Sequence, residues 1–348
     1  MDGNFRPTRG CPHVRDPYAF PAAFCSSGRH RRGIDGDRAE RTRRRRRAAD
    51  PEGVADGRID DLRWLDAARD ASVQLPRRLL SALRAFRHDA GPDGVLLLRN
   101  LPVVADDPLL PTPAVKGSVE RVPTVAASVI TTAMLNLGEV IAFRNEKTGA
   151  LVQNVVPVPG SEASQSNAGS VLLELHIENA FHDNRPDFVG LLCVREDPTG
   201  DAKLCTSSIR RALPLLSEKA RTVLGEPRFL TEPPPSFGAL DSVTPAHAVL
   251  NGDPEDPNVL VDFSATHPLD DEARQAMAEL RSAFMETMSA LSLRVGDLAV
   301  VDNRLAVHGR TSFTPSYDGA DRWLHRVYAH LDHRRSRVDR AGDGAVLG

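Results

Sequence analysis

Three side chains that could hold a metal ion stand out in this sequence: His176, Glu178 and His308. On an extended strand, side chains two residues apart point to the same face, so His176 and Glu178 can aim an imidazole and a carboxylate at one point. A second histidine, His308, delivered from a distant strand, completes a set of two histidines and one carboxylate. Such a set fills three positions of an octahedral ion and leaves the others open, which is the ligand pattern of non-haem Fe(II) sites.

The segments around His176 favour an interior position for this pair. Residues 169–175 are largely apolar, and residues 188–194 form a continuous apolar run that is typical of a buried strand. Two such residues at this spacing also occur by chance, so the polar face of a surface strand remains an alternative interpretation. A polar pair set between apolar strands nevertheless indicates a site that faces the interior.

Several short motifs follow one another in a fixed order along the chain, and His-Ile-Glu-Asn-Ala-Phe-His at 176–182 is one of them. The motifs lie at 138–147, 151–157, 165–170, 176–188, 296–304, 308–311 and 321–324. Together they resemble the clavaminate synthase-like family of Fe(II)/2-oxoglutarate oxygenases, over residues 58–333. Within that family the chain is most similar to the branch of L-asparagine oxygenases and arginine β-hydroxylases, which hydroxylate free amino acids at Cβ.

The resemblance implies a fold and an activity. The fold is α+β, with a double-stranded β-helix, the jelly-roll core of the cupins, and flanking helices; the element pattern alone predicts only a mixture of helices and strands. The activity is hydroxylation of a free L-amino acid, with Fe(II) held by His176, Glu178 and His308, and with 2-oxoglutarate and O2 as co-substrates. Asparagine is expected ahead of arginine, in specialised metabolite or antibiotic biosynthesis. Glu178 argues against halogenation, because related halogenases replace this carboxylate to make room for chloride.

The resemblance also assigns two arginines and one hydroxyl. Arg322, fourteen residues after His308, is expected to bind the C5 carboxylate of 2-oxoglutarate, since arginine offers a planar two-pronged donor. Arg326, on the same face, would then hold the α-carboxylate of the substrate; two exposed arginines on an edge strand are the alternative. Where the family has a Thr-Thr pair, this chain has Leu204 and Cys205 followed by Thr206. Either Thr206 supplies the hydroxyl, or the co-substrate is held less tightly.

Three further residues fall where the asparagine and arginine enzymes contact their amino acid: Glu146, Asn167 and Asp262. Asn167 could instead be a turn residue and Glu146 a loop charge. Asp262 lies in an apolar strand, where an acidic side chain needs a partner. The arginine hydroxylases use two acids on this strand, and the first is replaced here by Leu260, which favours a shorter or less basic substrate.

The chain has further histidines near these motifs, and its ligand set is compatible with other functions. We expect His182, His325 and His330 to be structural, because a fourth imidazole ligand would block the open metal positions. A zinc hydrolase could use the same three ligands, but the arginine pair would then have no role. A catalytically impaired cupin-type small-molecule binding protein is the main alternative, favoured by the Leu204 and Cys205 departure.

Charge divides the chain into unlike parts. The first fifty residues carry thirteen of the 44 Lys+Arg and six of the 47 Asp+Glu, so they are net +7 while the remainder is net −10. We predict a disordered basic tail at 1–57, an oxygenase domain at 58–335 and a flexible C-terminal tail at 336–348. We expect no nucleic-acid partner, no membrane span and a cytoplasmic location. The sequence does not fix the oligomeric state.

The spacing of apolar residues and the positions of residues that break helices predict the elements that must position these residues. Two helices are expected within 59–87, with a break at Pro76. Cys193 is expected to be a small core residue. The remaining expected elements are a strand at 95–101, a helix at 124–137, strands across 140–205, helices at 208–224 and 270–291, and strands at 298–301 and 323–331.

Overall fold

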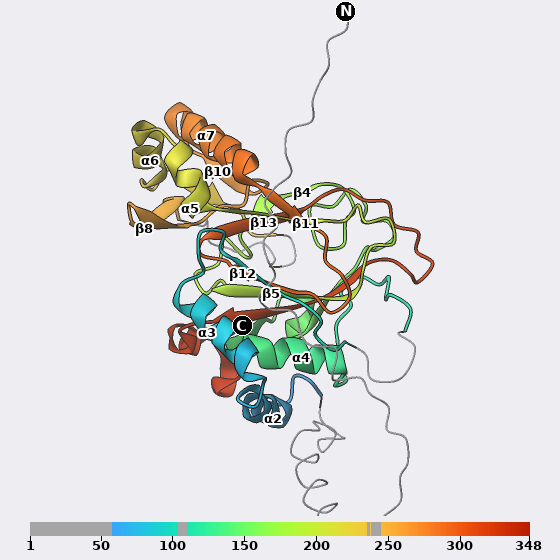
Figure 1. The fold of residues 1–348 in the computed structure, drawn as a ribbon. Coiled ribbons are helices and arrows are strands. Elements are labelled where there is room, and N and C mark those ends of the chain that lie inside the picture. Colours follow the sequence, from blue (N-terminus) through green and yellow to red (C-terminus); the bar gives the residue numbers. More distant parts are fainter. Residues whose placement is uncertain (1–57, 104–109, 235–236, 238–244) are drawn as a thin grey trace, which may run out of the picture.

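The computed structural model describes residues 58–103, 110–234, 237 and 245–348, and the basic tail predicted at 1–57 lies outside them. Two sheets, antiparallel except for the pairing of the last strand, lie one above the other at the centre (Figure 1). In the larger sheet the strand order is β1 (Val95–Leu98), β12 (Leu298–Asp302), β5 (Phe188–Arg195), β14 (Trp323–His330), β2 (Glu139–Phe143) and β15 (Val346–Leu347), with β3 (Gln153–Val155) also beside β14. In the smaller sheet the order is β11 (Ser289–Leu291), β6 (Leu204–Ser208), β13 (Ala306–Arg310) and β4 (Leu173–His176).

The side chains of each strand point alternately to the two faces of its sheet, which explains why the sheets pack face to face. On β5, the odd-numbered Val189, Leu191 and Cys193 join a buried cluster with Leu204 and Ala306 of the smaller sheet. The even-numbered residues of β5 pack with the helices instead. Because successive side chains point to opposite faces, one strand serves the interior between the sheets and the outer core at the same time. Cys193 is therefore the core residue that the sequence predicts.

Helices cover the outer faces of both sheets (Figure 1). The first group lies under the larger sheet and comprises α2 (Leu62–Ser72), α3 (Arg77–His88) and α4 (Val125–Met134). The second lies by the smaller sheet and comprises α5 (Ile209–Ala212), α6 (Glu218–Leu224) and α7 (Asp271–Thr287). Gly190 of β5 lets α4 approach, because the Met134 sulfur lies 2.6 Å from the place a Cβ would occupy.

Short elements complete the described fold. They are the 3-10 turns η3 (Lys147–Gly149), η4 (Leu213–Leu215), η6 (His333–Asp339) and η7 (Ala341–Asp343), and two strand pairs, β7 (Phe229–Thr231) with β10 (Thr266–Pro268) and β8 (Leu250–Asp253) with β9 (Asp256–Val259). In the described part of the chain, no helix has the length and apolar character needed to cross a membrane. The α+β architecture with flanking helices is as predicted.

Two predicted helices have different bounds in the structure. The helix expected at 208–224 is split, because β6 runs to Ser208 and Pro214 interrupts the turns between α5 and α6. Proline cannot donate an intrahelical hydrogen bond, which accounts for the break. The helix expected at 270–291 ends at Thr287, and residues 289–291 form β11, which pairs with β6.

The prediction of a flexible tail at 336–348 is wrong. Strand β15 pairs in parallel with β2, and Leu347 is buried in the cluster between the sheets. The buried Arg340 side chain donates hydrogen bonds to the carbonyl oxygens of Gly344, at 2.8 Å, and His333, at 2.9 Å. Backbone pairing and an internal arginine clamp therefore fix this segment to the domain.

Candidate functional site

The three proposed metal ligands meet at one edge of the smaller sheet. His176 ends β4 and lies directly opposite His308 of β13, and the centroids of the two rings are 4.5 Å apart. We had expected His176 and Glu178 on one strand, but β4 ends at His176 and Glu178 lies in the turn after it. One ligand atom from each of the three side chains lies within 4.8 Å of the others.

Asn303 fixes the turn that carries Glu178. Its side-chain oxygen accepts a hydrogen bond from the Glu178 backbone nitrogen at 2.7 Å, and its side-chain nitrogen donates to the Glu178 carbonyl oxygen at 3.1 Å. The same nitrogen also donates to the carbonyl oxygen of Pro186 at 2.9 Å. Asn303 lies between β12 and β13, so the segment that leads to His308 also holds Glu178.

The two imidazoles have the orientation and charge that a metal ligand needs. Nδ1 of His176 donates to the carbonyl oxygen of Glu174 at 2.8 Å, which leaves its Nε2 lone pair free for a metal. Nε2 of His308 lies 3.6 Å from Oε2 of Glu178. Burial, followed by the neighbouring His176, lowers the pKa of His308 and favours the neutral ring. A neutral imidazole is the form that binds a metal.

Glu178 remains ionised although it is buried. Burial by itself would raise its pKa, but the charge of Arg326, followed by the contact with the His308 ring, outweighs burial and holds the pKa of Glu178 well below its usual value. Arg326 donates from Nη1 to Oε1 of Glu178 at 2.9 Å. Oε2 is left to face His308.

Arg326 is held by several internal partners. Its Nε donates to the side-chain oxygen of Gln153 at 3.1 Å, and its Nη2 donates to Glu146. The Tyr328 hydroxyl donates to the same Glu146 oxygen at 3.1 Å. Two proposed substrate residues, Arg326 and Glu146, therefore contact each other beside Glu178. Gln153 is buried and lies opposite Arg326 on β3, and the sequence assigned it no role.

Asp262 lies next to the metal-ligand set. Its backbone forms an antiparallel bridge with His176, so the two side chains lie on the same side of the chain pair. Oδ1 of Asp262 accepts hydrogen bonds from the backbone nitrogen of Ser264, at 2.8 Å, and from its hydroxyl, at 2.7 Å. Oδ2 makes no hydrogen bond within the described residues.

Two asparagines, Asn167 and Asn179, differ in their position relative to the metal-ligand set. Asn167 is half-buried in the connection between β3 and β4, and its side chain makes no hydrogen bond to any residue that the structure describes. No hydrogen bond within the described residues links Asn167 to the metal-ligand set. Asn179, next to Glu178, has a positive φ of 53° and a buried side-chain nitrogen without a partner. Sequence analysis missed Asn179, although a His-x-Glu-Asn order was visible.

A second polar region lies farther along the same strands. Arg322 precedes β14 and is buried, and burial lowers its pKa to about 10. Arg310 of β13 is also buried, and burial together with the charge of Arg322 lowers its pKa to about 9. Across β13 and β6, Thr206 pairs with His308 and Leu204 pairs with Arg310. Sequence analysis singled out Arg322, Thr206 and Leu204 but not Arg310.

The other histidines lie away from the metal-ligand set. His182 packs edge-on against Phe143, with ring centroids 4.9 Å apart, and burial lowers its pKa. His325 lies 3.6 Å from a carboxylate oxygen of Glu120. His330 bonds through Nε2 to the carbonyl oxygen of Asn184 at 2.9 Å. None of these three histidines is part of the metal-ligand set, and both ring nitrogens of His325 are buried without a hydrogen-bond partner.

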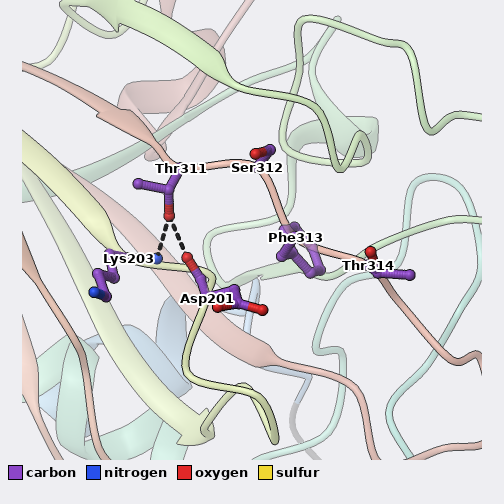
Figure 2. Close-up of a pocket in the computed structure, with 6 residues that line it drawn as sticks. All are labelled: Asp201, Lys203, Thr311, Ser312, Phe313 and Thr314. Carbon is purple, nitrogen blue, oxygen red and sulfur yellow. Dashed lines mark hydrogen bonds between the residues drawn. The ribbon is translucent and has the colours of Figure 1, made fainter.

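A pocket of about 460 Å³ lies beside the start of β6 and the end of β13. Figure 2 shows the six residues that line it. There Thr311 donates to the carbonyl oxygen of Asp201 and accepts from the backbone nitrogen of Lys203 at 2.8 Å. None of His176, Glu178 and His308 is among the residues that line this cavity, which are Asp201, Lys203, Thr311, Ser312, Phe313 and Thr314.

Comparison with known proteins agrees with this geometry. The chain is 51% identical over 294 residues to L-asparagine oxygenase of Streptomyces coelicolor, covering 84% of this chain and 88% of that protein. It is 35% identical over 291 residues to clavaminate synthase 2 of Streptomyces clavuligerus, covering 80% and 88%. A crystal structure of asparagine oxygenase with Fe(II), (2S,3S)-3-hydroxyasparagine and succinate matches with a TM-score of 0.84 and 49% identity, over 90% of this chain and 98% of that one.

These similarities confirm the family resemblance and the jelly-roll class that the motifs indicate. The family model described as taurine catabolism dioxygenase TauD, TfdA family matches residues 59–328, which include every proposed ligand. The chain therefore belongs to the TauD/TfdA dioxygenase family.

Proposed function

We propose that this protein is an Fe(II)- and 2-oxoglutarate-dependent oxygenase that hydroxylates a free L-amino acid at Cβ, with asparagine ahead of arginine. The observation that carries the proposal is the set of His176, Glu178 and His308, whose ligand atoms lie within 4.8 Å of one another. The similarity to L-asparagine oxygenase supports the choice of substrate.

The donor set fits Fe(II). Two neutral imidazoles and one ionised carboxylate are the ligands of the facial triad, and three donors leave room for a co-substrate. The hydrogen bond from His176 to Glu174 and the Asn303 clamp on Glu178 are supporting contacts of the kind that orient metal ligands. A zinc hydrolase would use the same donors but has no need of buried arginines near them.

When bound, Fe(II) and 2-oxoglutarate supply the oxidant that converts C–H into C–OH, while O2 is consumed and 2-oxoglutarate becomes succinate and CO2. The protein positions the reactants. Arg322 is our candidate for the distal carboxylate of 2-oxoglutarate, and Thr206, opposite His308, is our candidate for an added hydroxyl. An arginine in a buried site attracts a carboxylate more strongly than an exposed one, because less water screens the charges.

The charges around Arg326 suit an amino acid in its zwitterionic form. The guanidinium of Arg326 offers donors to an α-carboxylate, and Glu146 beside it offers an acceptor to an α-ammonium group. Arg326 is buried and Glu146 is partly buried, so a ligand that matches them replaces internal partners with little exposure of either charge to water.

Asp262 and Asn167 are our candidates for contacts to the substrate side chain. Oδ1 of Asp262 is occupied by Ser264, while Oδ2 remains to accept from an N–H donor such as a carboxamide. Asp262 lies between β9 and β10 and not in a strand as predicted. Leu260, two residues before it, is buried and apolar and leaves one acid rather than two. This favours asparagine over the longer, positively charged arginine.

A turnover screen tests the proposal directly. Purified protein with Fe(II), 2-oxoglutarate and O2 would be supplied with each free L-amino acid, and both succinate and a product 16 mass units heavier would be measured. We expect asparagine to give the highest coupled turnover. Succinate formation without any hydroxylated amino acid would reject the substrate proposal, and no metal-dependent succinate with any substrate would favour the impaired binding protein.

Other functional assignments stay predictions. We place the enzyme in the cytoplasm, with a small-molecule amino acid as its partner and no nucleic acid or membrane partner. A role in specialised metabolite biosynthesis is supported by the similarity to clavaminate synthase 2.

A further inference from the structure

Two buried arginines of the domain lack an acidic partner. Arg310 is 3% exposed and Arg322 is 6% exposed. Within the described residues, neither guanidinium forms an ion pair with an Asp or Glu side chain. Burying two like charges together is unfavourable unless an anion completes the site. Such a pair therefore indicates a place where a negatively charged ligand binds.

Strand register places the Arg310 side chain in the interior between the sheets, and Arg322 lies near enough for its charge to act on Arg310. Arg310 pairs with Leu204, and directly paired residues have their side chains on the same face. Leu204 packs in the interior cluster with Cys193 and Leu324. Arg322 precedes Leu324 by two residues, and its charge acts on the neighbouring Cys193. The two guanidinium groups thus lie near each other.

The guanidinium of Arg310 has some internal contacts, but one of its donors has no acceptor. Its Nη2 donates to the carbonyl oxygen of Val171 at 2.8 Å, and its guanidinium lies 4.9 Å from the centre of the Phe313 ring. Its Nε is buried and has no hydrogen-bond partner. A buried donor without an acceptor is unfavourable, especially when it is charged, so a ligand oxygen beside this nitrogen would stabilise it.

We propose that Arg310 and Arg322 together bind the distal carboxylate of 2-oxoglutarate, and that Arg310 replaces the hydroxyl that the family places at the position of Leu204. This inference rests on the proposed function. A carboxylate has four acceptor positions and can take donors from two guanidinium groups at once. The loss of a threonine opposite Arg310 therefore does not leave the distal carboxylate with a single partner.

The test compares how the Arg310→Gln variant and the wild type bind two 2-oxo acids, 2-oxoglutarate and 2-oxopentanoate. 2-Oxopentanoate has the chain length of 2-oxoglutarate but lacks the distal carboxylate. Calorimetric titration of the Fe(II)-loaded protein without oxygen measures the affinity of each acid. We expect Arg310→Gln to weaken 2-oxoglutarate by about tenfold to hundredfold, the range for a charge-assisted hydrogen bond. The affinity for 2-oxopentanoate should change by less than about twofold.

Arg221→Gln is the matched control. Arg221 of α6 also has a buried Nε without a partner and an Nη2 that donates to a backbone carbonyl, that of Leu213 at 2.8 Å. Its replacement should leave the affinity for both acids unchanged. Leu204→Thr, added to Arg310→Gln, should recover part of the lost 2-oxoglutarate affinity, because it restores a hydroxyl across the strand pair.

Equal weakening of both acids would overturn the inference, since a structural role through Val171 affects them alike. Unchanged 2-oxoglutarate affinity in Arg310→Gln would overturn it as well. If Arg310→Gln does not fold, Arg310→Lys serves instead, with the same selective loss expected at a smaller size. A wild-type protein that binds neither acid would contradict the proposed function itself, which separates the two failures.

Discussion

At the scale of single residues, the site depends on keeping each group in its metal-binding form. His308 stays neutral because it is buried, and Glu178 stays charged because Arg326 donates to it. These two effects act in opposite directions on neighbouring groups. The same enclosure therefore yields a neutral nitrogen and a negative oxygen within reach of one ion.

Removing either histidine should abolish metal-dependent turnover. We expect His176→Ala and His308→Ala to reduce Fe(II)-dependent succinate formation below about a tenth of wild type, because two ligands hold the ion poorly and in the wrong geometry. Circular dichroism and the unfolding temperature should remain near wild type. Activity above that level in a folded variant would show that the metal-ligand assignment is wrong.

Asp262→Ala should separate substrate recognition from co-substrate oxidation. A site that hydrogen-bonds a polar substrate rejects analogues lacking the partner by factors as large as about 10⁴. We expect kcat/KM for coupled hydroxylation to fall by about a hundredfold or more, with a much smaller change in uncoupled 2-oxoglutarate oxidation. If both fall equally, or if the best substrate is aliphatic, Asp262 has a structural role through Ser264.

Residues with chemically distinctive spacing could be predicted from the sequence, whereas residues that act only through strand pairing could not. His176, Glu178 and His308 were identified from type and order. Arg310 was not, because an arginine two residues after a ligand has no distinctive pattern until β6 places Leu204 opposite it. Asn303 was missed for the same reason, since its partners lie more than a hundred residues away.

At the scale of elements, local signals predicted the helices better than the short strands. Asp61 and Thr124 accept hydrogen bonds at the starts of α2 and α4, as expected for N-cap residues, and Pro76 separates α2 from α3. Strands β11 and β15 gave no such signal. Each has only two or three residues, and each is stabilised by a partner strand distant in sequence, which periodicity cannot reveal.

Strand β15 should contribute measurably to stability. Leu347 is 1% exposed, so Leu347→Ala removes buried methyl groups and should lower the free energy of unfolding by about 2–4 kcal/mol. Urea denaturation measures this change. Val338→Ala is the control, because Val338 is 92% exposed and its replacement should change the free energy by about 0.5 kcal/mol or less. Equal effects would restore the interpretation of a flexible tail.

His330, the last residue of β14, should make the free energy of unfolding depend on pH. Burial, followed by the charge of Arg335, lowers the pKa of His330 to about 4, whereas a histidine in the unfolded chain has a pKa near 6.5. Between these values the unfolded state binds a proton that the folded state does not. The contribution of neutral His330 to the free energy of unfolding is therefore complete above about pH 6.5. It declines as the pH falls toward 4, by up to about 3 kcal/mol.

His330→Gln tests that contribution. Urea midpoints at pH 7 and pH 4.5 should differ less in His330→Gln than in wild type. His88→Gln, at the exposed end of α3, should behave like wild type. Parallel loss of stability in all three proteins would exclude His330 as a source of the acid sensitivity.

At the scale of the whole molecule, two sheets bring residues that are far apart in sequence into one interior. Composition and motifs together predicted this class of fold, but the pairing of β4 with β13, which joins His176 to His308, could not be derived from either strand alone. Long-range pairing depends on which surfaces match in three dimensions. The C-terminal segment belongs to the same unit because β15 completes the edge beside β2.

A protein that starts at Arg58 should fold and turn over like the full chain. The residues before it carry a net positive charge and little apolar periodicity, so they have little surface to bury. We expect the unfolding temperature and kcat/KM of the shortened protein to match those of the full chain within experimental error. Precipitation or loss of activity would move the domain boundary toward the N-terminus.

The Asn303 clamp has a kinetic consequence. Asn303 and His308 belong to the single turn and strand that follow β12, and Asn303 grips the backbone of Glu178. Movement of this turn would displace His308 and Glu178 together, because both depend on it. An ion held here would therefore lose two ligands at once, and its residence time would depend on how long the turn stays closed.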